Sequence, residues 1–334
     1  MSEIPGIPST IVIDIRPTIG ALFCGAIAAA VFYGVTLLQT IFYFQTYPND
    51  KVFFRCLVLV IWALDTLDLI LVVNGVWTWT IVNYANPVAL LQVPWSIKTE
   101  PVIISTISVL VHLFMAYRIR TLNKRLTPIA IAIGAVSLFN WALGIFATIH
   151  SFRASGNIQT LNHGLHWAYA SANVSSAVLD VSIMTTLCLQ LYSSNHGFEK
   201  FSRTRRILTY LSAYMVANNL ITSTITVTGV ITYFSASKTL VYYAFLCLTS
   251  KAYTNTFLAQ LNAREHIRHQ VDQATSHLTA VTNRSLSSAF HSKQRAVIEI
   301  DQLTETTLDI VNPNLESPST ASVDYRKVGG DIRI

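Results

Sequence analysis

Long apolar stretches separated by short polar connections occupy the first 264 residues of the chain. Crossing about 30 Å of hydrocarbon takes roughly 20 helical residues, and apolar runs of that length with few charges are typical of membrane spans. The pattern predicts seven spans, at Thr18–Phe44, Cys56–Val82, Ser96–Arg118, Thr127–His150, Leu165–Tyr192, Ile207–Phe234 and Thr239–Leu261. We therefore expect an all-α, polytopic membrane protein with a bundle of seven transmembrane helices.

The third stretch is the least regular of the seven. Its uninterrupted apolar part is Val102–Tyr117, and Lys98, Glu100 and Pro101 come directly before that part. Pro101 is compatible with the first turn of a helix or with a kink in a longer helix. The alternative is a re-entrant third segment, which would leave six spans and would need other helices to bury its irregular backbone.

Composition agrees with a membrane protein. Of the 334 residues, 52% are hydrophobic and only 12% are charged, whereas charged residues make up about 25% of a typical soluble protein. A soluble fold would lack the charge to cover its surface, and a disordered chain would have far less apolar content. The four cysteines all lie in or beside apolar stretches, so we expect no disulfide.

Lys and Arg are distributed unevenly over the connections. The first, third and fifth connections and the end of the last span hold 12 of them, and the opposite side holds 4. Because basic loops stay in the cytoplasm, we expect the N-terminus outside or in a lumen and the C-terminus in the cytoplasm. The cytoplasmic basic loops include Arg118, Arg120, Lys124, Arg125, Arg203, Arg205 and Arg206.

Three regions follow from these patterns. Residues 1–17 form a short extracytoplasmic N-terminus, 18–264 form the membrane domain, and 265–334 form a cytoplasmic tail. Glu265–Val281 has apolar residues at near-helical spacing and predicts an amphipathic start to the tail. Beyond Asn283 the chain is rich in Ser, Thr and charges, a composition typical of disorder.

Ionisable side chains inside the predicted spans are the first candidates for function, because such groups are costly in lipid and face the bundle interior. Depths estimated from the helical rise place Asp65, Asp68, Asp180 and Lys251 near the middle of the membrane. We expect Lys251 to neutralise one carboxylate while another is protonated or holds a cation. The candidate intramembrane polar network comprises Asp65, Asp68, Asp180, Lys251, Asn255 and His112.

This network admits three interpretations. It could serve only to fix helix register and packing, it could bind a proton or cation and change shape, or it could line a pocket for a polar ligand. A lysine midway along a seventh span is also where retinal proteins form a Schiff base. The uninterrupted apolar part of the predicted third span, Val102–Tyr117, carries no acid as counter-ion, so we do not favour a retinal protein.

No pattern indicates catalysis, a metal or a cofactor. The chain has no His-Glu-x-x-His, Gly-x-Ser-x-Gly or phosphate-binding glycine loop. His163 and His166 have a spacing that could chelate a metal, but no acidic or sulfur ligand lies beside them. No basic stripe with interleaved aromatics indicates nucleic acid. We expect no enzyme, no metal site and no cofactor.

Several local patterns resemble a fungal, basidiomycete-type family of seven-span membrane proteins known only as a domain of unknown function. They are Tyr33-Gly34, Asp50 in the first connection and Asp65-Thr66. The most specific is the exit from the last span, Lys251 to Arg264, which ends in Leu-Asn-Ala-Arg. The resemblance covers roughly residues 17–264, implies a seven-helix bundle and a fungal source, and supplies no activity. The Asp-Arg-Tyr and Asn-Pro-x-x-Tyr motifs of the main class of G-protein-coupled receptors are missing.

The sequence therefore favours a receptor- or sensor-like protein of unknown ligand that signals through its cytoplasmic loops and tail. A proton- or cation-coupled transporter that uses the Asp/Lys network is the first alternative, and a structural membrane scaffold is the second. The expected partners are the lipid bilayer and a cytoplasmic signalling protein, with no nucleic acid. The expected location is the plasma membrane or an endomembrane.

Overall fold

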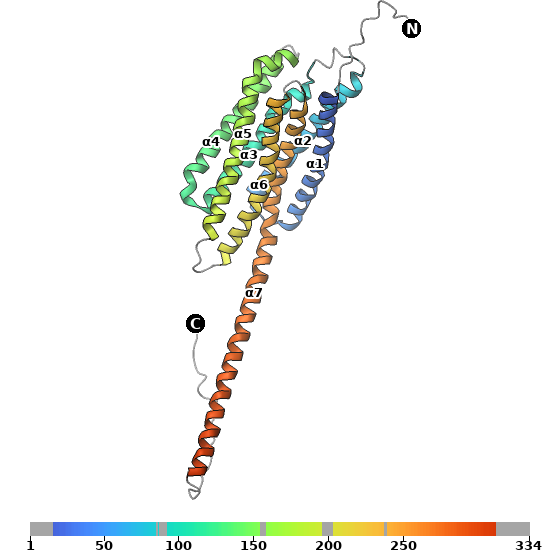
Figure 1. The fold of residues 1–334 in the computed structure, drawn as a ribbon. Helices are drawn as coiled ribbons and strands as arrows, with labels where there is room; N and C mark the ends of the chain where they lie inside the picture. Colours follow the sequence, from blue (N-terminus) through green and yellow to red (C-terminus); the bar gives the residue numbers. More distant parts are fainter. Residues whose placement is uncertain are drawn as a thin grey trace, which may run out of the picture. The chain divides into compact units, whose positions relative to one another are not determined.

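The fold is helical throughout the described part of the chain. The computed structural model describes residues 16–84, 86, 92–153, 158–195, 203–236 and 239–311, and no β-strand occurs among them. Figure 1 shows the α-helices in their order along the chain. Two π-helical segments and one 3-10 turn flank them. The elements are η1 Arg16–Gly20, α1 Ala21–Thr46, α2 Val52–Trp77, η2 Thr78–Val82, α3 Trp95–Leu122, η4 Lys124–Leu126, α4 Thr127–Arg153, α5 Ile158–Asn195, α6 Arg203–Ser235 and α7 Val241–Val311.

Six helical segments of the described chain are long and apolar enough to cross a membrane, which confirms a multi-pass membrane protein. They correspond to the first six predicted spans. The alternative of a re-entrant third segment is wrong, since α3 is one continuous helix with Pro101 in its interior. The predicted span Thr239–Leu261 lies mostly in α7 and is not among the six.

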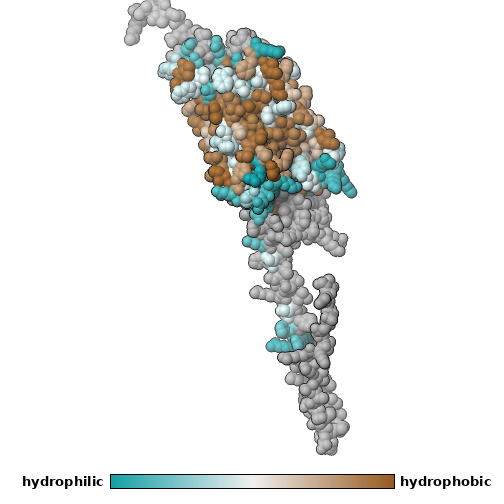
Figure 2. Space-filling view, turned by 180° about the vertical axis from the view of Figure 1, so that it is seen from behind, coloured by the Kyte–Doolittle hydropathy of each residue, from teal (hydrophilic) through white to brown (hydrophobic). Residues whose placement is uncertain are grey.

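Apolar side chains cover the outside of the bundle. Figure 2 shows a hydrophobic band with hydrophilic patches at its two ends. Val31 and Leu38 of α1 are 66% and 68% exposed, and Ile131 of α4 is 66% exposed. Soluble proteins rarely expose so much contiguous apolar surface, so the band is the surface that lipid contacts.

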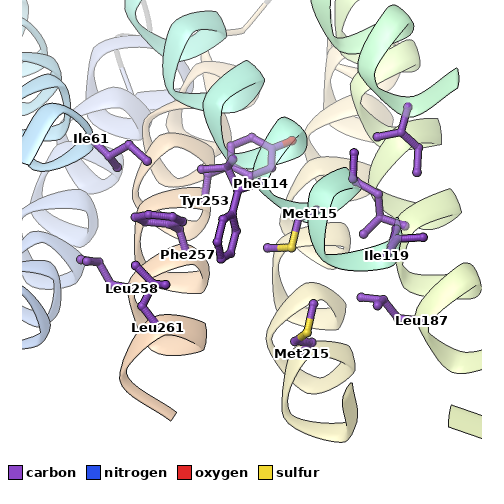
Figure 3. Close-up of a cluster of buried hydrophobic side chains, with 14 of the residues drawn as sticks. Ile61, Phe114, Met115, Ile119, Leu187, Met215, Tyr253, Phe257, Leu258 and Leu261 are labelled. Carbon is purple, nitrogen blue, oxygen red and sulfur yellow. The ribbon is translucent and has the colours of Figure 1, made fainter. Parts of the chain in front are cut away.

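The helices α1 to α6 pack against their neighbours in chain order, as expected for short connections. The first part of α7 is buried on all sides: Cys247 and nearly every residue from Thr249 to Leu261 are buried. Figure 3 shows Phe257, Leu258 and Leu261 of this segment in a hydrophobic cluster that includes Phe114 of α3. The segment therefore has no face toward lipid, which explains how it can be less apolar than the other spans.

The chain divides into two compact units, Met1–Asp272 and Gln273–Ile334. The second unit is helical as far as Val311, whereas the sequence predicted disorder beyond Asn283. A physical reason lies in the sequence itself, because α7 contains no Gly or Pro over its 71 residues. Most of the predicted N-terminal region 1–17, and the tail beyond Val311, lie outside the described residues.

Gly25 permits a close approach of α1 and α7. A Cβ atom at Gly25 would lie 2.6 Å from the Ala244 Cα, whereas one at Gly34 on the same helix would meet nothing within 4 Å. We expect Gly25→Ala to lower the free energy of unfolding by about 1–3 kcal/mol, because the two backbones must separate.

Gly34→Ala is the matched control. It adds the same methyl group in open space and should be neutral or stabilising by up to about 1 kcal/mol, owing to higher helix propensity. Thermal unfolding in detergent measures both variants. Equal melting temperatures for the two would contradict the close packing of α1 on α7.

Candidate functional site

The centre of the candidate site is a fully buried lysine between two fully buried aspartates. The Lys251 ammonium on α7 lies 3.0 Å from Asp65 Oδ1 and 3.2 Å from Asp68 Oδ2, and all three side chains are 0% exposed. The ammonium also donates a hydrogen bond to the Asp65 carbonyl oxygen. Asp65 and Asp68 can both reach it because residues three apart share one face of a helix. We call these three residues the Lys251 cluster.

Neighbouring polar groups complete part of the cluster. Ser250 donates a hydrogen bond of 2.6 Å to Asp68 Oδ2, and the Lys251 ammonium lies 5.7 Å from the centre of the Tyr33 ring on α1. Two carboxylate oxygens of the cluster, Asp65 Oδ2 and Asp68 Oδ1, are buried and have no hydrogen-bond partner in the described chain. The Thr254 hydroxyl, one turn after Lys251, is also buried without such a partner and lies near the Asp65 carboxyl.

Two carboxyl groups share one ammonium in the Lys251 cluster. If both carboxyl groups are ionised, the cluster has a net charge of −1 at a fully buried position. An unbalanced charge in a low dielectric is costly unless a further positive charge neutralises it. The unpartnered carboxylate oxygens are suitable acceptors for such a charge, so the geometry suits uptake of a proton or a small cation.

A second cluster lies two residues further along α7. His112 Nε2 of α3 is 3.1 Å from Asp180 Oδ1 of α5, and the Tyr253 hydroxyl donates a 2.8 Å hydrogen bond to Asp180 Oδ2. The His112 and Tyr253 rings meet edge to face at 5.2 Å. Asp180 is thus paired with His112, and within the described chain no hydrogen bond or ion pair joins it to Lys251. The residues predicted as one network therefore form separate clusters, each of which includes a residue of α7.

Ser108 also belongs to this cluster, so that a serine, a histidine and an aspartate lie in the order found in Ser-His-Asp catalytic triads. Its hydroxyl lies 3.4 Å from His112 Nδ1, and the residue is 7% exposed. Acyl transfer also needs donors for an oxyanion. The backbone N–H groups around Ser108 and His112 lie inside α3 and are used by the helix itself. The arrangement is suited to holding a proton between His112 and Asp180.

Glu100 is a buried acid outside the polar network predicted from the sequence. It is 1% exposed in α3, accepts a 2.5 Å hydrogen bond from the Tyr243 hydroxyl, and lies 3.7 Å from the Cys247 sulfur. Its position before Pro101 made it look like the edge of a span. Because α3 begins at Trp95, Glu100 lies in the second turn of the helix and points into the bundle.

The remaining network residue, Asn255, joins α7 to α1. Its amide donates a 3.1 Å hydrogen bond to the Phe32 carbonyl and accepts one of 3.2 Å from Thr36. On another side of α7, Thr256 and Thr222 of α6 are hydrogen-bonded at 2.9 Å. With the contacts above, polar side chains link α7 to α1, α2, α3, α5 and α6.

A separate contact joins the first connection to the end of the Lys251–Arg264 motif. Asp50 accepts hydrogen bonds from the Arg264 guanidinium and the Tyr43 hydroxyl, and Arg264 lies 4.7 Å above the Tyr47 ring. Burial of the Asp50 carboxyl raises its pKa, but the hydrogen bonds from Arg264 and Tyr43 outweigh burial, so the pKa lies below its ordinary value. Two patterns noted in the sequence, Asp50 and the Leu-Asn-Ala-Arg ending, therefore meet in space.

The basic loop residues are spread over one end of the bundle. Arg120, Lys124 and Arg125 are exposed, and Arg118 is half-buried. The side chains of Arg203, Arg205, Arg206, His163 and His166 lie outside the described residues, so their predicted roles remain predictions. Among the described residues, no group of three or more His, Cys, Asp or Glu could hold a metal ion.

Comparison with known families identifies a domain in the last third of the membrane region. Residues 176–266 match a family described as a family of unknown function, DUF6534. The match contains Asp180, Lys251, Asn255 and Arg264. No curated protein and no solved structure matches the chain significantly.

Removing Lys251 should destabilise the bundle. Lys251→Met leaves two buried carboxylates without their ammonium, and breaking a buried ion pair by removing one partner costs about 3–5 kcal/mol. We expect a large drop in melting temperature in detergent. The triple variant Lys251→Met/Asp65→Asn/Asp68→Asn should recover most of it, because it leaves no unpaired charge. A single variant as stable as the wild type would contradict the ion pairs.

The Asp50 contact predicts a pH-dependent contribution to stability. Because the pKa of Asp50 is lower in the folded state than in the unfolded state, its stabilisation is fully present above the unfolded pKa. That stabilisation is lost as pH falls through the folded value. The wild type should therefore unfold at a higher temperature than Asp50→Asn at pH 7, and the difference should shrink below about pH 4.

Melting curves between pH 7 and pH 3 test this prediction. Arg264→Gln should show a similar loss of pH dependence, because the carboxyl then lacks its charged donor. A difference between wild type and Asp50→Asn that stays constant over this range would contradict it.

Proposed function

We propose that the protein is a seven-span, sensor-like membrane protein with the N-terminus outside or in a lumen and the C-terminus in the cytoplasm. The seventh span in this proposal is Thr239–Leu261. Burial of Lys251 and its neighbours on all sides supports it, since a central helix needs little apolar surface of its own. The excess of Lys and Arg at one end of the bundle supports the orientation.

The observation that carries the sensor proposal is the Lys251 cluster on the central helix, in which two buried carboxyl groups share one ammonium. Gain or loss of one positive charge at Asp65 or Asp68 changes how strongly α2 holds Lys251. Since polar contacts join α7 to five other helices, a change at this cluster alters the packing of α7. A helix with two alternative sets of contacts is the element a switch needs. In this proposal the tail and basic loops pass the change to a cytoplasmic signalling protein.

A proton- or cation-coupled transporter is the second candidate. The unpartnered oxygens Asp65 Oδ2 and Asp68 Oδ1 favour it, since a carrier must bind and release its ion at such a site. The proposal of no enzymatic activity rests on the lack of a catalytic motif in the sequence. The fungal source and the choice between plasma membrane and endomembrane remain predictions.

Flux measurements in reconstituted vesicles separate the two candidates. The purified protein is placed in vesicles containing a pH-sensitive dye, and a proton, Na⁺ or K⁺ gradient is imposed. A carrier should give flux above that of empty vesicles, and Asp65→Asn should reduce it at least tenfold, about 1.4 kcal/mol in barrier height. Asp180→Asn, the same change in the other cluster, is the matched control.

The sensor proposal predicts a different pair of results. Flux should equal that of empty vesicles. Spin labels on cysteines introduced at the exposed positions Tyr117 and Tyr210 should report a distance that changes between pH 8 and pH 5. Asp65→Asn should abolish that change, and Asp180→Asn should not. A distance that is independent of pH, with no flux and only a loss of thermal stability in Asp65→Asn, would overturn both proposals and favour a scaffold.

A further inference from the structure

Two arginines at the end of the bundle lie on neighbouring aromatic rings. The Arg118 guanidinium of α3 is 5.2 Å from the Phe114 ring centre, and the Arg264 guanidinium of α7 is 5.7 Å from the Phe54 ring centre. The Phe54 and Phe114 rings pack edge to face at 6.5 Å. The two guanidinium groups are close enough to repel each other electrostatically.

Arg118 has no anionic partner in the described chain. It is half-buried, and among the described residues its guanidinium has no hydrogen bond, no ion pair and no carboxylate that acts on it electrostatically. A charged group that has lost part of its hydration normally gains a counter-charge in return. The Arg118 guanidinium instead lies near a second positive charge, that of Arg264, so its position is unfavourable until an anion binds.

Arg264 is only partly used by the protein. One terminal nitrogen donates to Asp50, and its Nε donates to the Leu261 carbonyl. The remaining N–H groups of the Arg264 guanidinium make no hydrogen bond within the described part of the chain, and 27% of the side chain is exposed. Asp50 offsets one of the two positive charges, which leaves a net +1 from these three groups, with exposed Arg120 and Lys124 nearby in sequence.

We propose that Arg118 and Arg264 bind a phosphate-bearing anion. A guanidinium group can donate two parallel hydrogen bonds to a pair of phosphate oxygens, and stacking on a neighbouring aromatic ring restricts its orientation. Arg118 lies four residues before the end of the apolar span Trp95–Leu122, or roughly 6 Å along the helix. That depth is the level of lipid phosphates, so the anion is either a lipid headgroup or a free phosphate at the same boundary. The proposal holds whether the bundle acts as a sensor or as a carrier.

Binding assays on the full-length protein test the site. The probes are nanodiscs of phosphatidylcholine with and without phosphatidic acid, read by native mass spectrometry of retained lipid, and inorganic phosphate in phosphatidylcholine nanodiscs, read by calorimetry. We expect Arg118→Gln to weaken phosphate binding about tenfold, the usual effect of one charge-assisted pair of hydrogen bonds. Arg120→Gln, an exposed arginine two residues away, should change affinity by less than about twofold.

Three outcomes are decisive. Retention of phosphatidic acid that depends on Arg118 but not Arg120 supports the site with a lipid as its source. Binding of inorganic phosphate with the same dependence, and no preference for phosphatidic acid, supports it with a soluble source. No binding, or equal losses in Arg118→Gln and Arg120→Gln, overturns it. Melting temperatures of both variants check that the fold is kept, and Arg118→Lys, which keeps the charge but loses the fork, should bind with intermediate affinity.

Discussion

A lysine ammonium held between two carboxylates, all of them out of contact with water, is the interaction on which the rest of the bundle depends. Lys251, Asp65 and Asp68 are each 0% exposed. Such a group can exist inside a membrane only if the charges meet each other and are surrounded by protein. The position of α7 among the other helices follows from this requirement, and so does its unusual share of polar residues.

The other polar contacts of α7 extend the same principle along the helix. Tyr243 reaches Glu100, Tyr253 reaches Asp180, and Asn255 reaches the backbone of α1. Lipid provides no hydrophobic drive between helices, so small residues and buried polar groups hold a bundle together. Gly25 is the small residue that allows α1 to approach α7 closely, and Glu100 and Asp180 are the buried polar groups that bond to α7. A network in which carboxylates outnumber cations is also sensitive to protons and cations, which makes the core a candidate switch as well as a fastening.

The sequence predicted the elements that depend on local pattern, and it missed those that depend on packing. Apolar runs located six spans, and the spacing of Asp65 and Asp68 placed both on one face of α2. The partner of Asp180 could not be predicted, because His112 and Tyr253 come from helices far apart in the chain. Glu100 was not predicted to join the network because it lies before the uninterrupted apolar run Val102–Tyr117, although it is inside α3, which begins at Trp95. The helix through Val311 was not predicted, because its Ser, Thr and charged residues are typical of disorder, although it contains no Gly or Pro.

Solid-state NMR of the protein in lipid, with ¹⁵N-labelled lysine and ¹³C-labelled aspartate, tests the central ion pairs most directly. Lys251 is assigned by the signal that disappears in Lys251→Met. The account predicts a charged ammonium at Lys251 whose nitrogen signal is strongly dephased by aspartate carboxyl carbons, with the dephasing lost in Asp65→Asn/Asp68→Asn. A neutral amine signal, or an ammonium that no aspartate carbon dephases, would contradict it.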